Sequence, residues 1–143
     1  MKIKPVFFSA LLGAALLTLP GISSAQDPVE ITPQRSPAGI EYVMSSVGED
    51  QQNAMAAIRK DYNFHLTFAR PKSGEFLADV KVTVETVKKE KVLEVVSEGP
   101  YLFAKLPAGT YKVTAEFEGK SQTKTTTIRK NRSSDLVYYF AEQ

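Results

Sequence analysis

The chain of 143 residues has no cysteine and only one histidine, His65. The absence of cysteine excludes disulfide bonds, thiolate zinc sites and thiol nucleophiles. With one imidazole and no thiol, a closed metal site would depend on carboxylates, which are not the usual ligand set of a transition metal. We therefore expect no metal, no cofactor and a domain that is stabilised by packing alone.

Sequence motifs of catalysis and of phosphate binding are also missing. The chain has neither a glycine-rich phosphate loop nor a G-x-S-x-G segment. A catalytic triad would have to use His65 by elimination, with a serine from a turn or a strand end: Ser97, Ser121, Ser133 or Ser134. We expect no catalytic residue, and we expect His65 to be an ordinary half-exposed strand histidine on the face opposite Phe64 and Phe68.

The only long apolar run lies at the N-terminus. Lys2 and Lys4 precede it, and the small residues Ser23, Ser24 and Ala25 follow it. The run, residues 6–19, has about 14 residues and is too short to span a bilayer. This pattern predicts a secretory signal peptide over residues 1–25, cut after Ala25, and a periplasmic or secreted mature chain without a transmembrane span.

The chain is also expected to have no net charge once the signal peptide is removed. Removal of Lys2 and Lys4 lowers the number of basic residues from 18 to 16, which equals the number of acidic residues, so the formal charge falls from +2 to zero. A neutral chain has no global field that attracts nucleic acid or an anionic membrane. We expect neither as the main partner.

The mature chain divides into three parts. Residues 26–45 form a proline-rich lead that is expected to be extended, with a possible short strand at residues 40–44. Residues 46–62 are expected to form an amphipathic helix. Ser46 and Glu49 have the spacing of a capping box, and an apolar stripe follows at Met55, Ile58 and Tyr62.

Residues 63–143 alternate apolar and polar side chains, which is typical of half-buried strands. Turn residues separate roughly seven short strands, so the sequence predicts a mainly β fold, a seven-stranded antiparallel β-sandwich of one domain. Residues 120–129 are rich in threonine and lysine and are expected to form an edge strand. Residues 92–96 are apolar on both sides, which indicates either a central strand or a bulge.

The segment from Gly99 to Val113 contains the core Leu106-Pro107-Ala108-Gly109-Thr110-Tyr111. It resembles the signature of carboxypeptidase regulatory-like domains, which are transthyretin-like or collagen-adhesin B-type Ig-like sandwiches. The resemblance covers about residues 63–140. It implies that Leu106 closes one end of the sandwich, that Pro107 and Gly109 form a turn, and that Tyr111 points inward.

The resemblance also implies a non-catalytic accessory role, as in small exported bacterial proteins that carry this domain alone. Some collagen-adhesin B-type domains form an isopeptide bond between a first-strand lysine and a last-strand Asn or Asp. Here the first strand offers no inward lysine, and Asn131 and Asp135 lie in or beside a turn. We do not expect this bond.

Three further groups of residues have a structural and a functional interpretation. Glu116 and Glu118 are expected to form a solvated strand face, although paired carboxylates can perform acid and base chemistry. Two basic clusters are expected to keep turns soluble, although each could bind an anion: Lys88, Lys89 and Lys91, and Arg129, Lys130 and Arg132. One of Tyr138 and Tyr139 must face outward, and exposed tyrosines are typical both of partner-binding patches and of the contact between a helix and a sheet.

The sequence therefore favours a non-enzymatic exported module of the cell envelope that binds a protein or peptide. The alternative is a protein that binds a small ligand, such as a glycan or a peptidoglycan fragment. The sequence identifies neither the binding face nor the partner.

The predicted cleavage of the signal peptide can be tested directly. Protein isolated after expression of the full-length chain in a bacterial host is expected to begin at Gln26, because the signal peptide ends at Ala25. N-terminal sequencing or intact mass measures this. A purified protein that retains Lys2 and Lys4 would contradict the prediction.

Overall fold

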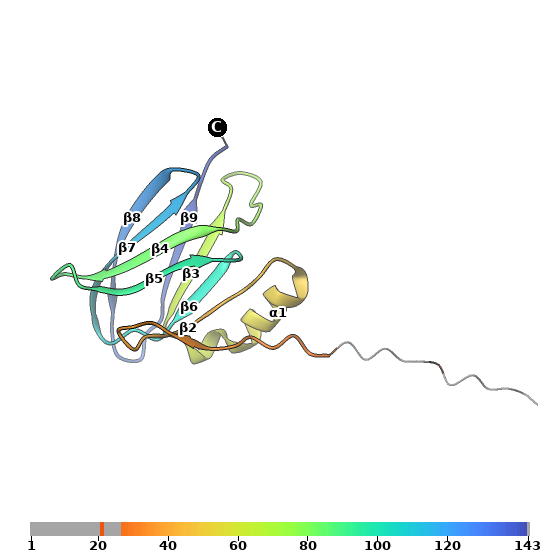
Figure 1. Ribbon diagram of the computed structural model, residues 1–143, viewed down its shortest axis with the longest axis horizontal. Coiled ribbons are helices and arrows are strands. Elements are labelled where there is room, and N and C mark those ends of the chain that lie inside the picture. The colour runs from red at the N-terminus through yellow and green to blue at the C-terminus, as the bar shows by residue number, and fades with distance from the viewer. Residues whose placement is uncertain (1–20, 22–26, 143) are drawn as a thin grey trace, which may run out of the picture.

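The fold consists of two packed β-sheets and one α-helix (Figure 1). The computed structural model describes residue 21 and residues 27–142. The predicted signal peptide therefore lies outside the described residues, apart from Gly21. Sheet A has the strand order β1-β2-β6-β3-β9, with β1 Gln34–Arg35, β2 Glu41–Met44, β6 Tyr101–Ala104, β3 Phe64–Ala69 and β9 Ser134–Tyr139. Sheet B has the order β5-β4-β7-β8, with β5 Lys91–Ser97, β4 Val80–Thr86, β7 Gly109–Phe117 and β8 Lys120–Ile128.

The prediction of a mainly β, two-layered fold is confirmed, but two of its details are wrong. Residues 63–142 do form seven strands, β3 to β9, but the lead adds β1 and β2 to sheet A, so the sandwich has nine strands among the described residues. The strands are also not all antiparallel, since β3 and β9 run parallel. The chain leaves β8 of sheet B and crosses through residues 129–133 to the end of sheet A where β3 begins. Ser134 N–H donates to Asn63 O there (2.8 Å), so β9 starts beside the start of β3.

The lead is attached to sheet B by one serine. Ser36 Oγ donates to Val92 O (2.7 Å) and accepts from Ile40 N–H (3.1 Å). Val92 is the extra residue of a β-bulge in β5, because Val84 pairs with Leu93 and Glu85 with Lys91. The sequence had left two interpretations of residues 92–96, a central strand or a bulge. The bulge is confirmed, and the central strand is wrong because β5 is an edge strand of sheet B.

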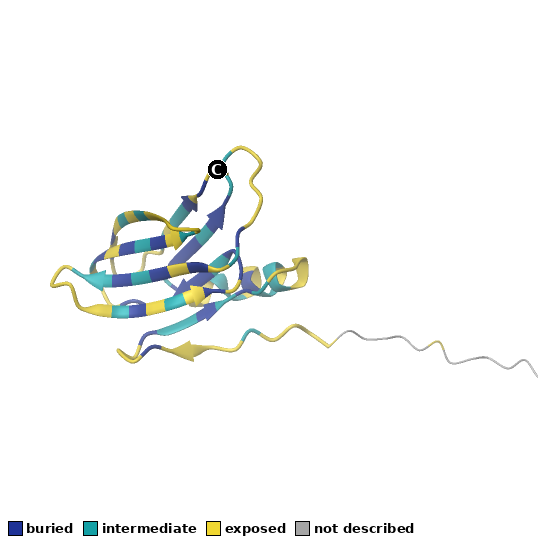
Figure 2. Cartoon of the chain, turned by 45° about the horizontal axis from the view of Figure 1, so that its top comes forward, coloured by how far each residue is buried: buried dark blue, intermediate teal, exposed yellow. Residues whose placement is uncertain are grey.

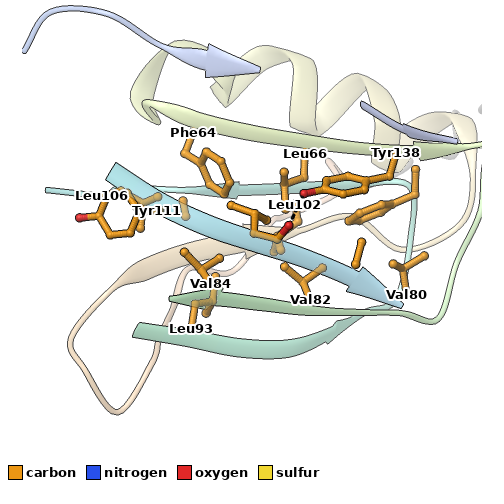
Figure 3. Close-up of a cluster of buried hydrophobic side chains, with 14 of the residues drawn as sticks. Phe64, Leu66, Val80, Val82, Val84, Leu93, Leu102, Leu106, Tyr111 and Tyr138 are labelled. Carbon is orange, nitrogen blue, oxygen red and sulfur yellow. Dashed lines mark hydrogen bonds between the residues drawn. The ribbon is translucent and has the colours of Figure 1, made fainter. Parts of the chain in front are cut away.

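The core lies between the two sheets: burial alternates along the strands (Figure 2), and the buried side chains of facing strands meet there (Figure 3). Phe64, Leu66 and Phe68 point inward from β3 toward Val80, Val82 and Val84 of β4. Burial of each such side chain contributes about 1.5–3 kcal/mol. Tyr138 is also fully buried, and its hydroxyl donates to Val113 O (2.7 Å), which satisfies the polar atom inside the core.

The segment that carries the family resemblance closes one end of this core. Leu106 is buried among the core side chains, and Tyr111 lies beside it with its ring inward (Figure 3). The Tyr111 hydroxyl donates to Pro107 O (2.7 Å), and Gly109 is the first residue of β7. Asn63 fixes the same segment, because its side-chain amide donates to Leu106 O and accepts from Leu106 N–H (2.8 Å each).

The helix packs on the other face of sheet A, away from the core between the sheets (Figure 3). It comprises α1, Glu49–Ile58, and a 3-10 turn η1, Arg59–Asp61, so it begins three residues later than expected. Met55 of α1 and Tyr62, which directly follows η1, form a second cluster with Val43 and Phe103 of sheet A, and Ile58 packs against it. The predicted apolar residues therefore face the sheet, although Tyr62 is extended and lies beyond the helix.

The prediction of a capping box formed by Ser46 and Glu49 is wrong. Gly48 occupies the N-cap position with φ 129°, so Glu49 is the first helical residue and not the third. No side chain caps the helix there, and Ser46 N–H donates instead to Gln51 Oε1 (3.2 Å). Among the described residues, no helix is long and apolar enough to cross a membrane.

The facing edges of the two sheets are joined by side chains. Residues 120–129 were expected to form an edge strand, and β8 is indeed the edge of sheet B. Its Lys124 Nζ donates to Val137 O and its Gln122 Nε2 donates to Tyr139 O (2.5 Å each). Two outward carbonyl groups of β9 are therefore hydrogen bonded without a neighbouring strand.

Gly99 allows the start of β6 to approach the end of β2. A Cβ atom at this position would lie 2.5 Å from Ser45 O and 2.6 Å from Ser46 O, both of which are backbone atoms. Gly99→Ala is therefore expected to destabilise the fold by about 1–3 kcal/mol, because the backbone must move apart. Urea unfolding measures the change. The neighbouring exposed Glu98→Ala is the control and should stay within about 0.5 kcal/mol of the wild type; equal stability of the two variants would contradict the close approach.

Candidate functional site

His65 is the buried member of a polar cluster beneath η1, whose other two side chains, Arg59 and Asp135, are partly exposed. Its side chain is 4% exposed, so the expected half-exposed histidine is wrong. The sequence pattern placed it on the outer face of the strand, but η1 covers that face. The ring joins three elements: Nδ1 contacts Asp135 Oδ1 of β9 (2.5 Å), and Nε2 contacts Arg59 O of η1 (2.8 Å). The His65 cluster comprises His65, Asp135 and Arg59.

The contacts of His65 leave neither ring nitrogen free. A carbonyl oxygen only accepts hydrogen bonds, so Nε2 donates its proton to Arg59 O. Arg59 Nη2 also donates to Asp135 Oδ1 (2.7 Å), and the edge of the His65 ring packs against Phe103, with 4.7 Å between ring centroids. A general base must present a free nitrogen to its substrate. This geometry suits a residue that holds η1 against the sheet.

The candidate serines are not brought to His65 by a hydrogen bond. Ser97 is buried and its hydroxyl donates to Gly99 O (2.8 Å). Ser134 forms a hydrogen bond with Thr126, while Ser121 and Ser133 are exposed. Ser133 lines a shallow pocket that His65 also lines, although both His65 nitrogens contact other groups.

Glu116 and Glu118 do not lie on one strand face. Glu116 lies on the outer face of β7, but Glu118 lies in the turn after it with φ 48°, so the predicted shared strand face is wrong. Strand β7 ends at Phe117, one residue too early to include Glu118. In the part of the chain that the structure describes, no three His, Asp or Glu side chains are grouped so that they could hold a metal ion.

The aromatic residues separate into two groups. Tyr138 is buried and Tyr139 is 52% exposed, which confirms that one of the two faces outward. Tyr62 and Phe103 pack where the helix meets sheet A, with Tyr101 at the margin of that cluster. Tyr42 is half-buried and its hydroxyl donates to Gln34 Oε1 (3.1 Å). Three of these six rings, Tyr62, Tyr101 and Phe103, therefore cover the contact between helix and sheet, and Tyr139 alone among the six is exposed.

A basic cleft opens beside the His65 cluster, with a volume of about 690 Å³. It is bounded by η1, by the β6–β7 connection (residues 105–108) and by the β8–β9 connection (residues 129–133). Five basic side chains and one acidic side chain, Asp61, line it; the basic ones are Lys60, Lys105, Arg129, Lys130 and Arg132. The sequence had indicated only the last three, as a soluble turn.

One of the five cations is already paired. Lys105 Nζ lies 2.6 Å from Glu41 Oε2 and 5.2 Å from the centroid of the Tyr62 ring. The hydrogen bond from Lys105 lowers the pKa of Glu41 below its usual value, and the same bond raises the pKa of Lys105. Burial raises the pKa of Tyr62. The other four cations form no ion pair with any described residue.

Two elements that border the basic cleft, η1 and the β8–β9 connection, are also held by contacts of the His65 cluster. Lys60 follows Arg59 in η1, so the hydrogen bonds of Arg59 fix the wall that carries Lys60. Asp135 follows the β8–β9 connection and fixes its end, while Ser134 N–H is bonded to Asn63 O. The His65 ring therefore holds both walls of the cleft in place.

His65→Leu tests this role. Leucine keeps the apolar contact with Phe103 but leaves Arg59 O without its donor, so we expect a loss of about 1–3 kcal/mol in the free energy of unfolding. Amide hydrogen exchange should also become faster in residues 59–62, because η1 is no longer held. Tyr42→Phe, which removes a hydrogen bond of an exposed hydroxyl in the same sheet, is the control. Unchanged exchange in η1 would contradict the role of His65.

Comparison with known proteins assigns no family. No protein-family model matches this chain, and a search of curated proteins finds none that matches it. The resemblance of residues 99–113 to carboxypeptidase regulatory-like domains stays a prediction from those residues.

Proposed function

We propose that this protein is an exported, non-enzymatic accessory module of the bacterial cell envelope that binds a partner protein or peptide at the basic cleft. The single observation that carries the proposal is the cleft itself, where four cations have no ion pair among the described residues. A hollow lined by unpaired charge favours a partner of the opposite sign.

The distribution of charge strengthens this assignment. Basic and acidic residues are equal in number after residue 25, yet the cleft gathers five cations and a single anion. Lys105 and Glu41 offset each other, which leaves four cations against Asp61. Charge concentrated in a concave site increases the local concentration of an anionic partner and its association rate, while it leaves the rest of the surface neutral.

The non-enzymatic part of the proposal rests on the contacts of the candidate residues. Both nitrogens of His65 are engaged, and Glu118 diverges from Glu116 at the end of β7. The accessory role also agrees with the resemblance of the Leu106–Tyr111 segment to carboxypeptidase regulatory-like domains. We accordingly propose that the sandwich is of the transthyretin-like or Ig-like type, and that the mature chain is periplasmic or secreted.

A second candidate function is the binding of a small ligand, such as a glycan or a peptidoglycan fragment, next to Tyr139. This tyrosine is half-exposed and lines a shallow hollow with Arg70, Pro71, Lys72 and Gly74. An exposed ring beside two cations suits a compact ligand that carries an acid group. The hollow is about 350 Å³, half the volume of the basic cleft, so we place the main site in the cleft.

Charge reversal tests the proposed function. The full-length chain, exported from its own cells, is crosslinked to its envelope partner, and the product is identified by mass spectrometry. The double variant Lys130→Glu/Arg132→Glu is expected to lose most of this product, because two attractive charges become repulsive. Lys88→Glu/Lys89→Glu at the β4–β5 turn makes the same charge change at two residues that do not line the cleft, and it should keep the crosslinked product. Equal loss in both variants, or in neither, would contradict the assignment.

A further inference from the structure

We propose that the occupant of the basic cleft is an extended peptide segment that carries several neighbouring carboxylates. This inference rests on the proposed function and adds the chemistry of the partner. It follows from how the cations are distributed, from which groups of the cleft are free to donate, and from the shape of the site.

The unpaired cations come from two separate segments of the chain, one on each of two walls. Lys60 projects from η1, while Arg129, Lys130 and Arg132 come from the β8–β9 connection on the other wall. All four side chains belong to exposed residues. Cations that are separated in this way neutralise several anionic groups placed along a chain better than they neutralise one compact group.

Two guanidinium groups, those of Arg129 and Arg132, are among the donors that line the cleft. Arg132 N–H donates to Arg129 O (3.3 Å), and Ser134 N–H at the start of β9 donates to Asn63 O (2.8 Å), so these two amides are already bonded within the fold. A compact phosphate is commonly held by several backbone N–H groups that point at it. The two guanidinium groups instead offer planar pairs of donors, which match the two oxygens of a carboxylate.

The shape of the cleft distinguishes a peptide from the other polyanions. A concave site accepts a narrow protruding chain, whereas a bilayer presents a broad surface that the cations inside a hollow contact poorly. Single-stranded nucleic acid is held by aromatic rings on which its bases stack. The one aromatic residue that lines the cleft, Tyr62, is 6% exposed and has the Lys105 ammonium over its ring.

A labelled hexaglutamate peptide measures the inference directly. We expect it to bind the exported wild-type protein at low ionic strength, as followed by fluorescence anisotropy, and to bind more weakly as salt is added. Lys130→Glu/Arg132→Glu should weaken binding about tenfold or more, since each exposed pair contributes modestly and two charges are reversed. Lys88→Glu/Lys89→Glu is the matched control and should bind as the wild type does.

Three further ligands separate the alternatives. Hexaglutamine should not bind, and inorganic phosphate should compete with hexaglutamate only weakly. Vesicles of phosphatidylglycerol and a single-stranded oligodeoxynucleotide should bind less tightly than hexaglutamate. Tighter cleft-dependent binding of phosphate, vesicles or oligonucleotide would overturn the inference, as would equal binding of hexaglutamate by both double variants.

The outcomes also separate this inference from the proposed function. If the envelope partner is still crosslinked through the cleft while hexaglutamate fails to bind, the proposed function stands and the carboxylate-rich segment is rejected. If hexaglutamate binds in the cleft but crosslinking in cells gives no cleft-dependent partner, the chemistry of the site stands and the envelope role is rejected. Thermal unfolding of each variant confirms that the exposed substitutions leave the fold intact.

Discussion

The burial of β3 on both faces is the constraint on which the rest of the structure depends. Phe64, Leu66 and Phe68 fill the core between the sheets, and His65 on the opposite face lies under η1. A polar ring in that position needs partners, because an unbonded polar group in a buried site costs stability. Asp135 and Arg59 provide them, and the same contacts bring η1 and the β8–β9 connection to one end of the sandwich. The basic cleft is a consequence of this arrangement.

The sequence was sufficient for the parts of the fold that depend on local pattern. The threonine- and lysine-rich composition placed β8 at an edge, alternation required one of Tyr138 and Tyr139 to face outward, and the helical stripe identified Met55 as buried. It could not give the partner of each strand, since pairing depends on contacts between distant segments. The parallel pairing of β9 with β3, and hence the contact between His65 and Asp135, could not be seen for that reason.

The candidate site was only partly accessible from the sequence. Arg129, Lys130 and Arg132 were visible as a basic turn, and turns are often basic for solubility alone. Lys60 lies on the opposite wall and is separated from them along the chain by six of the nine strands, so no window of sequence contains both walls. The sequence does show basic residues just before β3, at Lys60, and just before β9, at Arg129, Lys130 and Arg132. Only the fold shows that these two places in the chain line the same cleft.

The side chains that join β8 to β9 have a consequence for assembly. A strand at the border of a sheet usually offers free backbone groups on which another copy can align, and this is how many β-rich proteins polymerise. In this protein the carbonyl groups of Val137 and Tyr139 are already engaged by Lys124 and Gln122. An incoming strand would have to displace both bonds, so these two carbonyl groups are not available as a template for pairing with another copy.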